Sequence, residues 1–469
     1  MKNLTINAIY DGGTLGSVPI ADANAVEQAL ATAAALHADK SAWLPLHDRV
    51  AILERLALLM RERKSEIALQ AAREGGKPLA DSLVETERAI DGVKICIEVI
   101  RHDHGSVIAM GTTAASAGRR AFTQRQPIGV VVAVSAFNHP LNLIVHQVAT
   151  AVAAGCPVLV KPAKTTPLSA LALVQMLHQA GLPKAWCQFV LPAENSLTER
   201  MVTDPRTAFL TFIGSEKVGW MLRSKLAPGT RCALEHGGVA PLFVAADGNL
   251  EAALAAVSKG GFYHAGQVCV SVQRVYADQR IARRFAEQLA TRAKALKVGD
   301  PTSKETQVGP LIRAQEVERV HEWVYEAVDK GAQLLCGGEP LPQQCYAPTV
   351  LYDPDPTARV STQEIFGPVV CVYPYTDIAQ AIASANSLEF AFQAAVFTDS
   401  LEIAETVFAN IDASAVMVND HTAFRVDGMP FAGLKRSGLG IGGMPYTIAD
   451  MQIEKMMVWN GTVKAEKPR

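Results

Sequence analysis

The sequence has no excess of charge in either direction and few aromatic residues. Its 469 residues include 44 Lys and Arg against 46 Asp and Glu, a net charge of -2, and only 6% aromatic residues. Nucleic-acid binding depends on clustered basic side chains, so this balance argues against a nucleic-acid partner. Apolar residues at 49% and charged residues at 19% favour a well-buried globular protein over a disordered one.

Long apolar runs are also missing. The most apolar stretch, residues 127–160, is interrupted by polar side chains such as Asn138 and His146, which the centre of a bilayer would penalise. The first five residues, MKNLT, lack the apolar run of a signal peptide. We therefore expect a cytoplasmic protein without a membrane partner.

The eight cysteines form no CxxC pair, and no His/Cys cluster has the spacing of a zinc site. Most are flanked by apolar residues, which is typical of a reduced protein whose cysteines are small core residues. We therefore expect no metal. Cys269 differs, because it ends the run Gly266-Gln267-Val268-Cys269 between an expected helix and an expected strand. A thiol at such a junction can be a nucleophile, and a buried core cysteine is the alternative.

The period of the apolar residues changes along the chain. It predicts helices over residues 25–38, 47–72 and 80–99. The stretch 113–126, rich in Gly, Ser, Thr, Arg and Gln, predicts a hairpin or an extended arm. Strands and helices then alternate, with strands expected at 129–134, 157–161, 187–191 and 208–213 and helices at 141–154 and 168–180. This alternation predicts a parallel sheet with helices on its faces.

The alternation resumes after Gly237 and predicts a second α/β domain. Its expected strands are 241–245, 272–277, 369–375, 394–398 and 414–419, and its expected helices 250–265, 280–294 and 313–330. Residues 451–459 alternate well enough for an edge strand. We find no internal repeat and no low-complexity tail.

Two further side chains have the chemistry to act with Cys269. Glu235 stands before the pair Gly237-Gly238, so its carboxylate can be aimed into a cleft as a base toward water, although a solvated Glu is the alternative. Asn138 follows an expected parallel strand, at the end where such sheets bind ligands. Its amide can donate to an oxyanion, and the alternative is an ordinary turn Asn before Pro140.

Two strand ends suggest a dinucleotide. Lys161 in Lys161-Pro162-Ala163-Lys164 can bond ribose hydroxyls or a phosphate, and a solvated charge is the alternative. Gly214-Ser215, with Gly219, opens an expected helix whose first backbone N–H groups attract phosphate. This GxxxxG spacing is not the Rossmann GxGxxG fingerprint.

Together these residues resemble the NAD(P)-dependent aldehyde dehydrogenase superfamily over nearly the whole chain. The intervals fit as well, with 23 residues from Asn138 to Lys161 and 34 from Glu235 to Cys269. The matching strings occur in the order of the family: Phe137-Asn138-His139-Pro140, Lys161-Pro162-Ala163, Phe212-Ile213-Gly214-Ser215, Glu235-His236-Gly237-Gly238, Gly266-Gln267-Val268-Cys269, Glu364-Ile365-Phe366-Gly367-Pro368 and Met429-Pro430-Phe431-Ala432-Gly433-Leu434-Lys435 with Ser437-Gly438.

The resemblance implies an α/β fold of three parts. A Rossmann-like NAD(P)-binding domain comprises residues 1–110 and 127–237, and a catalytic domain residues 238–445. A small β bridging and oligomerisation element comprises 111–126 and 446–469, and proteins of this kind are usually homodimers or homotetramers. The implied cofactor contacts are Ser135, Phe137, Lys161, Ala163, Lys164, Gly214, Ser215, Gly219, Gly237, Glu364 and Phe366.

The resemblance also implies a reaction. Cys269 adds to an aldehyde, Asn138 steadies the oxyanion, hydride passes to NAD(P)⁺, and water activated by Glu235 hydrolyses the thioester. One alternative is the CoA-acylating branch, which generally lacks the general-base Glu. Others are a non-catalytic member and a cofactor-independent cysteine esterase that pairs Cys269 with His264.

Several positions depart from the common pattern. Lys164 stands where many NAD-preferring members carry a Glu that grips the adenosine ribose, so we expect that NADP⁺ is used. His236 replaces a usual Leu and Ala432 a usual Gly. The combination resembles the subgroup acting on small hydroxylated or anionic aldehydes, such as lactaldehyde, sulfolactaldehyde, phosphonoacetaldehyde or succinate semialdehyde. The substrate-binding candidates are His139, Arg425, Phe431, His264, Arg101 and His102.

Overall fold

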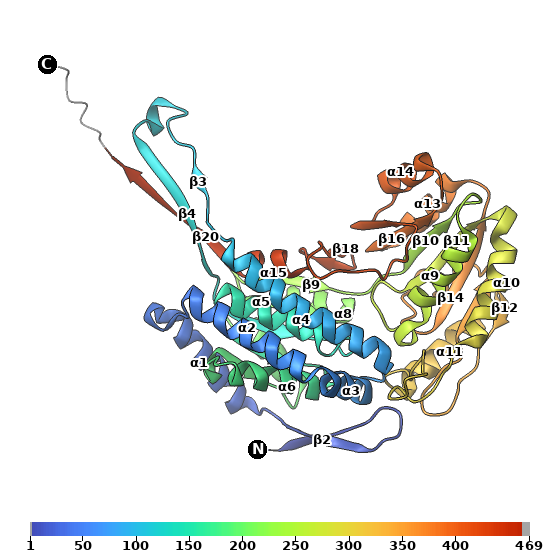
Figure 1. The fold of residues 1–469 in the computed structure, drawn as a ribbon, viewed down its shortest axis with the longest axis horizontal. Coiled ribbons are helices and arrows are strands. Elements are labelled where there is room, and N and C mark those ends of the chain that lie inside the picture. Colours follow the sequence, from blue (N-terminus) through green and yellow to red (C-terminus); the bar gives the residue numbers. More distant parts are fainter. Residues whose placement is uncertain (1, 462–469) are drawn as a thin grey trace.

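The computed structural model describes residues 2–461, and two large sheets dominate it (Figure 1). The first sheet has the strand order β19-β9-β8-β5-β6-β7, and every neighbouring pair is parallel except β19 with β9. Its strands are β5 (Val130–Val134), β6 (Val158–Lys161), β7 (Cys187–Phe189), β8 (Thr207–Ile213), β9 (Arg231–Glu235) and β19 (Gly438–Leu439). The expected strand–helix alternation is confirmed here.

Both faces of the first sheet are buried, which explains why β5 is apolar at every position. Val131 and Ala133 pack into the cluster formed with α2 to α6, whereas Val130 and Val132 pack with α1, α7 and α8 on the other face. These helices are α1 (Ala23–Ala38), α2 (Leu46–Glu62), α3 (Lys64–Gly75), α4 (Leu79–Arg101), α5 (Asn142–Ala154), α6 (Pro167–Gln179), α7 (Asn195–Thr203) and α8 (Glu216–Arg223).

The second sheet has the order β12-β13-β14-β11-β10-β16-β17 and lies between helices α9 to α11 and helices α13 and α14 (Figure 1). Its strands are β10 (Ala240–Val244), β11 (Val272–Asp278), β12 (Gln333–Cys336), β13 (Thr349–Tyr352), β14 (Val369–Tyr375), β16 (Gln393–Phe397) and β17 (Ala415–Val418). Its helices are α9 (Leu250–Phe262), α10 (Gln279–Ala295), α11 (Ala314–Asp329), α12 (Arg359–Thr362), α13 (Ile378–Asn386) and α14 (Leu401–Asn410). The chain passes between the sheets at β9–β10, and we propose a domain boundary there, near residue 238.

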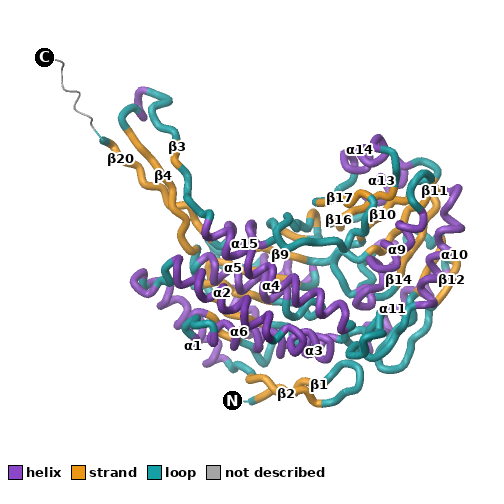
Figure 2. Tube along the Cα trace, viewed as in Figure 1, coloured by secondary structure: helices purple, strands orange, loops and turns teal. Residues whose placement is uncertain are grey.

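A narrow arm projects from the first sheet (Figure 2). It is a three-stranded antiparallel sheet of β3 (Val107–Ile108), β4 (Arg119–Pro127) and β20 (Gln452–Asn460), in the order β20-β4-β3. The extended arm expected at 113–126 and the edge strand expected at 451–459 therefore pair with each other. Residues 462–469 of the expected bridging element lie outside the described residues.

Some elements differ from the expectations. The helix expected over 47–72 is two helices, because Arg63 leaves the helical backbone at φ -101°, ψ 13°. The helix expected over 250–265 stops at Phe262, and His264, Ala265 and Gly266 turn left-handed. The sequence did not predict an N-terminal hairpin of β1 (Asn3–Asn7) and β2 (Thr14–Pro19), the pair β15 (Phe390–Ala391) with β18 (Leu434–Lys435), or helix α15 (Met444–Asp450). Over residues 2–461, no helix is both long and apolar enough to cross a membrane.

Candidate active site

A pocket of about 920 Å³ opens where strands of the first sheet end. Register pairs Val134 with both Lys161 and Phe212, and Ile213 with Glu235, so four parallel strands finish at one edge. Open parallel sheets bind ligands at this edge. The pocket is lined by three groups of the expected residues: Cys269, Glu235 and Asn138; Ser135, Phe137, Lys161, Ala163, Lys164, Gly214, Ser215, Gly237, Glu364 and Phe366; and His139, Arg425 and Phe431.

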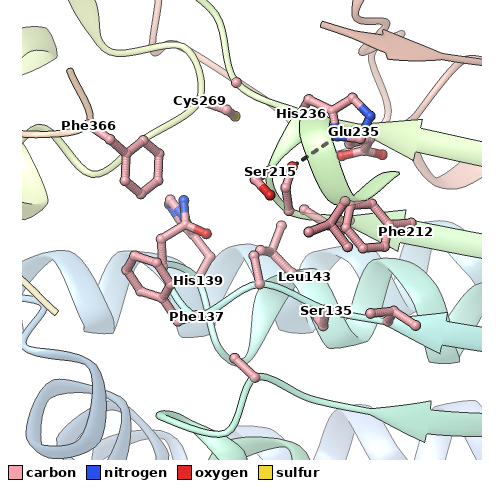
Figure 3. Close-up of a pocket in the computed structure, with 18 of the residues that line it drawn as sticks. Ser135, Phe137, His139, Leu143, Phe212, Ser215, Glu235, His236, Cys269 and Phe366 are labelled. Carbon is pink, nitrogen blue, oxygen red and sulfur yellow. Dashed lines mark hydrogen bonds between the residues drawn. The ribbon is translucent and has the colours of Figure 1, made fainter. Parts of the chain in front are cut away.

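The turn before Cys269 is held by a close backbone approach. Gly266 has φ +69°, and a Cβ on it would lie 2.1 Å from the carbonyl oxygen of Gly367, so a side chain does not fit there. The next residue, Gln267, is fully buried, and its side chain bonds the oxygens of His264 and Pro310 and the N–H of Ile312. These contacts fix the short loop that presents Cys269 to the pocket (Figure 3).

Asn138 is tied to the same loop. Its Nδ2 donates to the carbonyl oxygen of Gln267 at 3.0 Å, and an amide nitrogen carries a second hydrogen that this bond leaves for a ligand. The helix that follows, α5, is capped from another element, because Glu85 of α4 accepts from the N–H groups of Leu141 and Asn142. Glu85 in turn forms a buried pair with Lys77 at 2.5 Å. The Asn138 side chain is therefore held by the Cys269 loop, and the backbone that follows it is held by Glu85.

Glu235 is the last residue of β9, and its carboxyl group lies against the backbone of Gly442. A Cβ on Gly442 would lie 2.5 Å from its Oε1, so Gly442 makes room for this carboxyl group. Burial raises the pKa of Glu235 above the ordinary range, and the nearby Arg425 opposes that rise. A carboxyl group with a raised pKa is better matched to proton transfer near neutral pH. Gly442 has no motif signal that would have identified it from sequence.

The thiol of Cys269 is protonated in the free protein at neutral pH. Burial raises its pKa to about 12, Arg425 opposes the rise, and the charges of Glu364 and Glu235 add to it. Cys269, Glu235 and Arg425 all line the same pocket. Formation of the thiolate therefore needs a proton acceptor or a positive charge brought into the pocket.

One end of the pocket fits a dinucleotide. Lys161 is enclosed enough that burial lowers its pKa to about 8, whereas Lys164 is exposed and donates to the Ala193 carbonyl oxygen at 2.7 Å. Ser135 also lines this pocket, and its buried hydroxyl has no hydrogen-bond partner among residues 2–461. An unpartnered buried hydroxyl is a place for a ligand to bond.

Glycine also shapes the cofactor half. A Cβ on Gly237 would lie within 2.0 Å of the Glu364 carboxyl group, whose pKa burial raises to about 8. Phe366 faces Phe137 edge-on at 5.8 Å between ring centroids. Gly219 was expected to contact the cofactor, but it does not line the pocket. It lies behind it in α8, because a Cβ there would lie 2.0 Å from the ring of His236.

Two arginines stand at the other end of the pocket. The Arg425 guanidinium lies 3.5 Å from the Phe431 ring centroid, and its buried Nε and Nη2 atoms have no hydrogen-bond partner in the described chain. Arg88 of α4 also lines the pocket, and it donates twice to the buried carboxylate of Asp427. Asp427 also bonds His146 at 2.6 Å. Sequence analysis missed Arg88, since its partner Asp427 is 339 residues away.

Three of the substrate-binding candidates do not line the pocket. Arg101 and His102 end the 23-residue helix α4, where Arg101 pairs with Glu54 and His102 bonds the Glu98 carbonyl oxygen. At about 1.5 Å per residue they lie roughly 20 Å along the helix from Arg88. His264 is fully buried behind the pocket, because its left-handed backbone turns it inward. Its ring lies 6.2 Å from that of His139, between centroids.

Comparison with known proteins then settles the family. The model of the aldehyde dehydrogenase family matches residues 2–457. The chain belongs to this family. A 3-sulfolactaldehyde dehydrogenase of Priestia megaterium is 37% identical over 430 residues, covering 92% of this chain and 90% of the relative.

Solved structures agree with this aldehyde dehydrogenase throughout the fold. Aldehyde dehydrogenase 21 from Physcomitrella patens, in complex with the reaction product succinate, is 34% identical with a TM-score of 0.94 over 98% of this chain and 96% of that one. The glyceraldehyde-3-phosphate dehydrogenase GapN from Methanocaldococcus jannaschii, complexed with NADP, is 32% identical with a TM-score of 0.93 over 98% and 100%. The predicted family, fold and NAD(P) cofactor are confirmed: the protein is an oxidoreductase that oxidises aldehydes with NAD(P).

Proposed function

We propose that this aldehyde dehydrogenase works through a covalent intermediate on Cys269. The supporting observation is the shared pocket, which is lined by a thiol, a buried carboxyl group with a raised pKa and an amide with a second hydrogen left for a ligand. The thiol of Cys269 gives its proton to solvent water, its sulfur bonds the aldehyde carbon, and the electron pair of the carbonyl double bond moves to the oxygen, which becomes an oxyanion. The Asn138 amide and the Cys269 backbone N–H stabilise that charge.

The second half of the reaction releases the acid. When bound, the nicotinamide cofactor accepts the hydride that leaves the former aldehyde carbon. The carbon is then a thioester on Cys269. Glu235 takes a proton from a water molecule, whose oxygen attacks the thioester carbon, and the carbon–sulfur bond breaks. The leaving sulfur takes the proton back from Glu235 to return the thiol, and the acid product loses its own proton to solvent as the carboxylate. The raised pKa of Glu235 suits this exchange of protons near neutral pH.

The cofactor half favours use of NADP⁺. Lys161 and Ser135 would hold the ribose and phosphate region, and the exposed ammonium group of Lys164 would pair with a 2′-phosphate. A lysine cannot accept the ribose hydrogen bonds that a carboxylate accepts.

A panel of aldehydes assayed with both cofactors tests this proposal. We expect the acid as product, and a kcat/KM with NADP⁺ within about tenfold of that with NAD⁺ or above it, because one charge-assisted contact is worth about this much. Initial rates from absorbance at 340 nm with equal cofactor concentrations measure the ratio. Strict dependence on NAD⁺ would contradict the role of Lys164, and absence of oxidation with every aldehyde would contradict the whole proposal.

The substrate end favours a small aldehyde with an anionic tail. Arg425 has two buried nitrogen atoms without protein partners, whereas the charge of Arg88 is met by Asp427. A buried guanidinium without a carboxylate partner is a site for a carboxylate, sulfonate or phosphonate. The relatives support this, since one is named for 3-sulfolactaldehyde and another holds succinate. His139 and Phe431 complete the walls of this end.

Replacing Arg425 by alanine should discriminate between aldehydes. We expect kcat/KM for succinate semialdehyde to fall by about 10- to 100-fold more than for propanal, because a hydrogen bond to a charged group is lost only with the anion. Some loss with propanal is expected too, since Arg425 lowers the pKa of Cys269. Arg101→Ala, an exposed arginine paired with Glu54, is the matched control. Equal losses for both aldehydes would exclude a tail-binding role.

The arm supports assembly with a second copy. Apolar side chains are exposed along it, and a thin three-stranded sheet is weak on its own. The exposed residues are Val107, Ile108, Phe122, Ile453, Met456, Met457, Val458 and Trp459. We propose that the arm packs on a neighbouring copy in a homodimer or homotetramer, and a monomer in sedimentation velocity at micromolar concentration would contradict this.

A further inference from the structure

Arg436, which does not line the pocket, forms an ion pair with Glu216, the first residue of helix α8. Arg436 donates through Nε and Nη2 to both carboxylate oxygens of Glu216, at 2.6 and 2.7 Å. Its Nη1 donates to Glu389 at 2.6 Å. The backbone joins the same contact, because Trp220 Nε1 donates to the Arg436 carbonyl oxygen at 3.1 Å. Helix α8 is thus attached to a segment that follows the second sheet.

Glu216 stands next to the expected cofactor phosphates. It is the first residue of α8 and follows Ser215, which lines the pocket with Gly214. The negative charge of Glu216 acts on two groups that line the pocket. Burial is the main cause of the raised pKa of Glu364, and Glu216 adds to it. Burial also lowers the pKa of His236, and Glu216 opposes that fall. The side-chain exposure of Glu216 is 25%, so solvent screens this charge in part.

The position of Glu216 creates a conflict between two anions. A carboxylate in the first helical turn is favourable for the helix dipole. The same helix end attracts the pyrophosphate of a dinucleotide, which an adjacent carboxylate repels. A bidentate arginine neutralises the carboxylate and fixes its direction. The neutralised helix end is then available to the ligand.

We propose that Arg436 is a positioning residue for cofactor binding, which neutralises Glu216 and draws it toward Glu389 so that α8 can receive the pyrophosphate. This inference rests on the proposed cofactor site. Arg436 itself does not line the pocket. Arg436 therefore acts on NAD(P) affinity through Glu216 and not through direct contact.

A double-mutant cycle on NADP⁺ affinity tests the inference. Isothermal titration calorimetry at low ionic strength would compare the wild type, Arg436→Met, Glu216→Gln and the double variant. We expect Arg436→Met to raise Kd for NADP⁺ by about three- to tenfold, as repulsion between partly screened charges predicts. Glu216→Gln should bind as tightly as the wild type or tighter. The double variant should return to within about twofold of Glu216→Gln, because no carboxylate is left to neutralise.

Two controls separate charge from structure. Arg206→Met removes an arginine that likewise bridges two carboxylates, Glu27 and Asp204, but at the opposite end of β8, and it should leave Kd unchanged. Adenosine 2′-phosphate, which has no pyrophosphate, should bind Arg436→Met as it binds the wild type. A general distortion of the cofactor domain would weaken both ligands.

The outcomes are distinct. If the double variant binds NADP⁺ as weakly as Arg436→Met, Arg436 acts by fastening α8, and the inference is wrong. An Arg436→Met protein with unchanged Kd, or one that also loses adenosine 2′-phosphate, contradicts it equally. If the wild type binds neither NADP⁺ nor NAD⁺, the proposed cofactor site itself fails, and the inference falls with it.

Discussion

Replacing Cys269 with alanine should reduce aldehyde oxidation by at least about 10³-fold, because a covalent mechanism has no route without its nucleophile. Cofactor binding should persist, since Cys269 is one of many residues that line the pocket. The measurement is kcat/KM from initial rates, together with Kd for NADP⁺ by calorimetry. Intact protein mass after a quenched single turnover should show an acyl adduct on the wild type and none on the variant.

Cys232→Ala provides the matched control for this experiment. Cys232 is partly buried on β9, three residues before Glu235, and should be dispensable because it does not line the pocket. The pH dependence of alkylation adds a second test. Because the pKa of Cys269 is about 12, iodoacetamide should inactivate the free protein faster by about tenfold per pH unit between pH 7 and 9. Full activity in Cys269→Ala would contradict the covalent mechanism.

Replacing Glu235 with glutamine should stop the reaction after its first half. We expect a burst of reduced cofactor close to one per active site, followed by a steady rate lower by about 10²- to 10⁴-fold, because the thioester forms but water is not activated. Rapid mixing followed at 340 nm resolves the two phases. In the wild type, hydrolysis should rise with pH through the raised pKa of Glu235, since the base must be ionised to act.

Two comparisons make the Glu235 result specific. Glu364→Gln removes another buried carboxyl group of the pocket and should raise KM for the cofactor without accumulating a thioester. Coenzyme A supplied to the wild type distinguishes the CoA-acylating alternative, because preferential release of acyl-CoA would show that water is not the acceptor. Loss of the burst itself in Glu235→Gln would place Glu235 in the first half of the reaction.

Short strings were enough to predict that Cys269, Glu235 and Asn138 belong together, since all three line one pocket. A Cβ on Gly237 would lie 1.8 Å from a Glu364 carboxyl oxygen, and one on Gly266 would lie 2.1 Å from the Gly367 carbonyl oxygen, so each string needs its glycine. The parallel strands were also predictable, since β5 is apolar at every position and bounded by turn residues. One alternative from sequence was an esterase that pairs Cys269 with His264, but both ring nitrogens of the buried His264 lack a hydrogen-bond partner among residues 2–461, Cys269 included.

Only part of the substrate end could be predicted in the same way: Arg425, His139 and Phe431 line the pocket as expected, whereas Arg88 was missed. Arg88 and Arg101 lie on one helix, and the period of α4 does not say which of them meets the pocket. That depends on Asp427, which the fold brings to Arg88 from 339 residues away. His264 looked like a member of the site because a continued helix was expected, and a left-handed turn places it behind the pocket instead.

The order of residues along the chain was therefore enough to predict the α/β fold, because the apolar period follows from local backbone geometry, and seven short strings in order carried the resemblance to the family and named the types of chemical group. The three-dimensional arrangement was needed to show which charges face the pocket and which are already neutralised, as with Arg425 against Arg88 and Glu216 against Arg436. The physical reason is that a charge acts across space over several ångströms, whatever its separation along the chain.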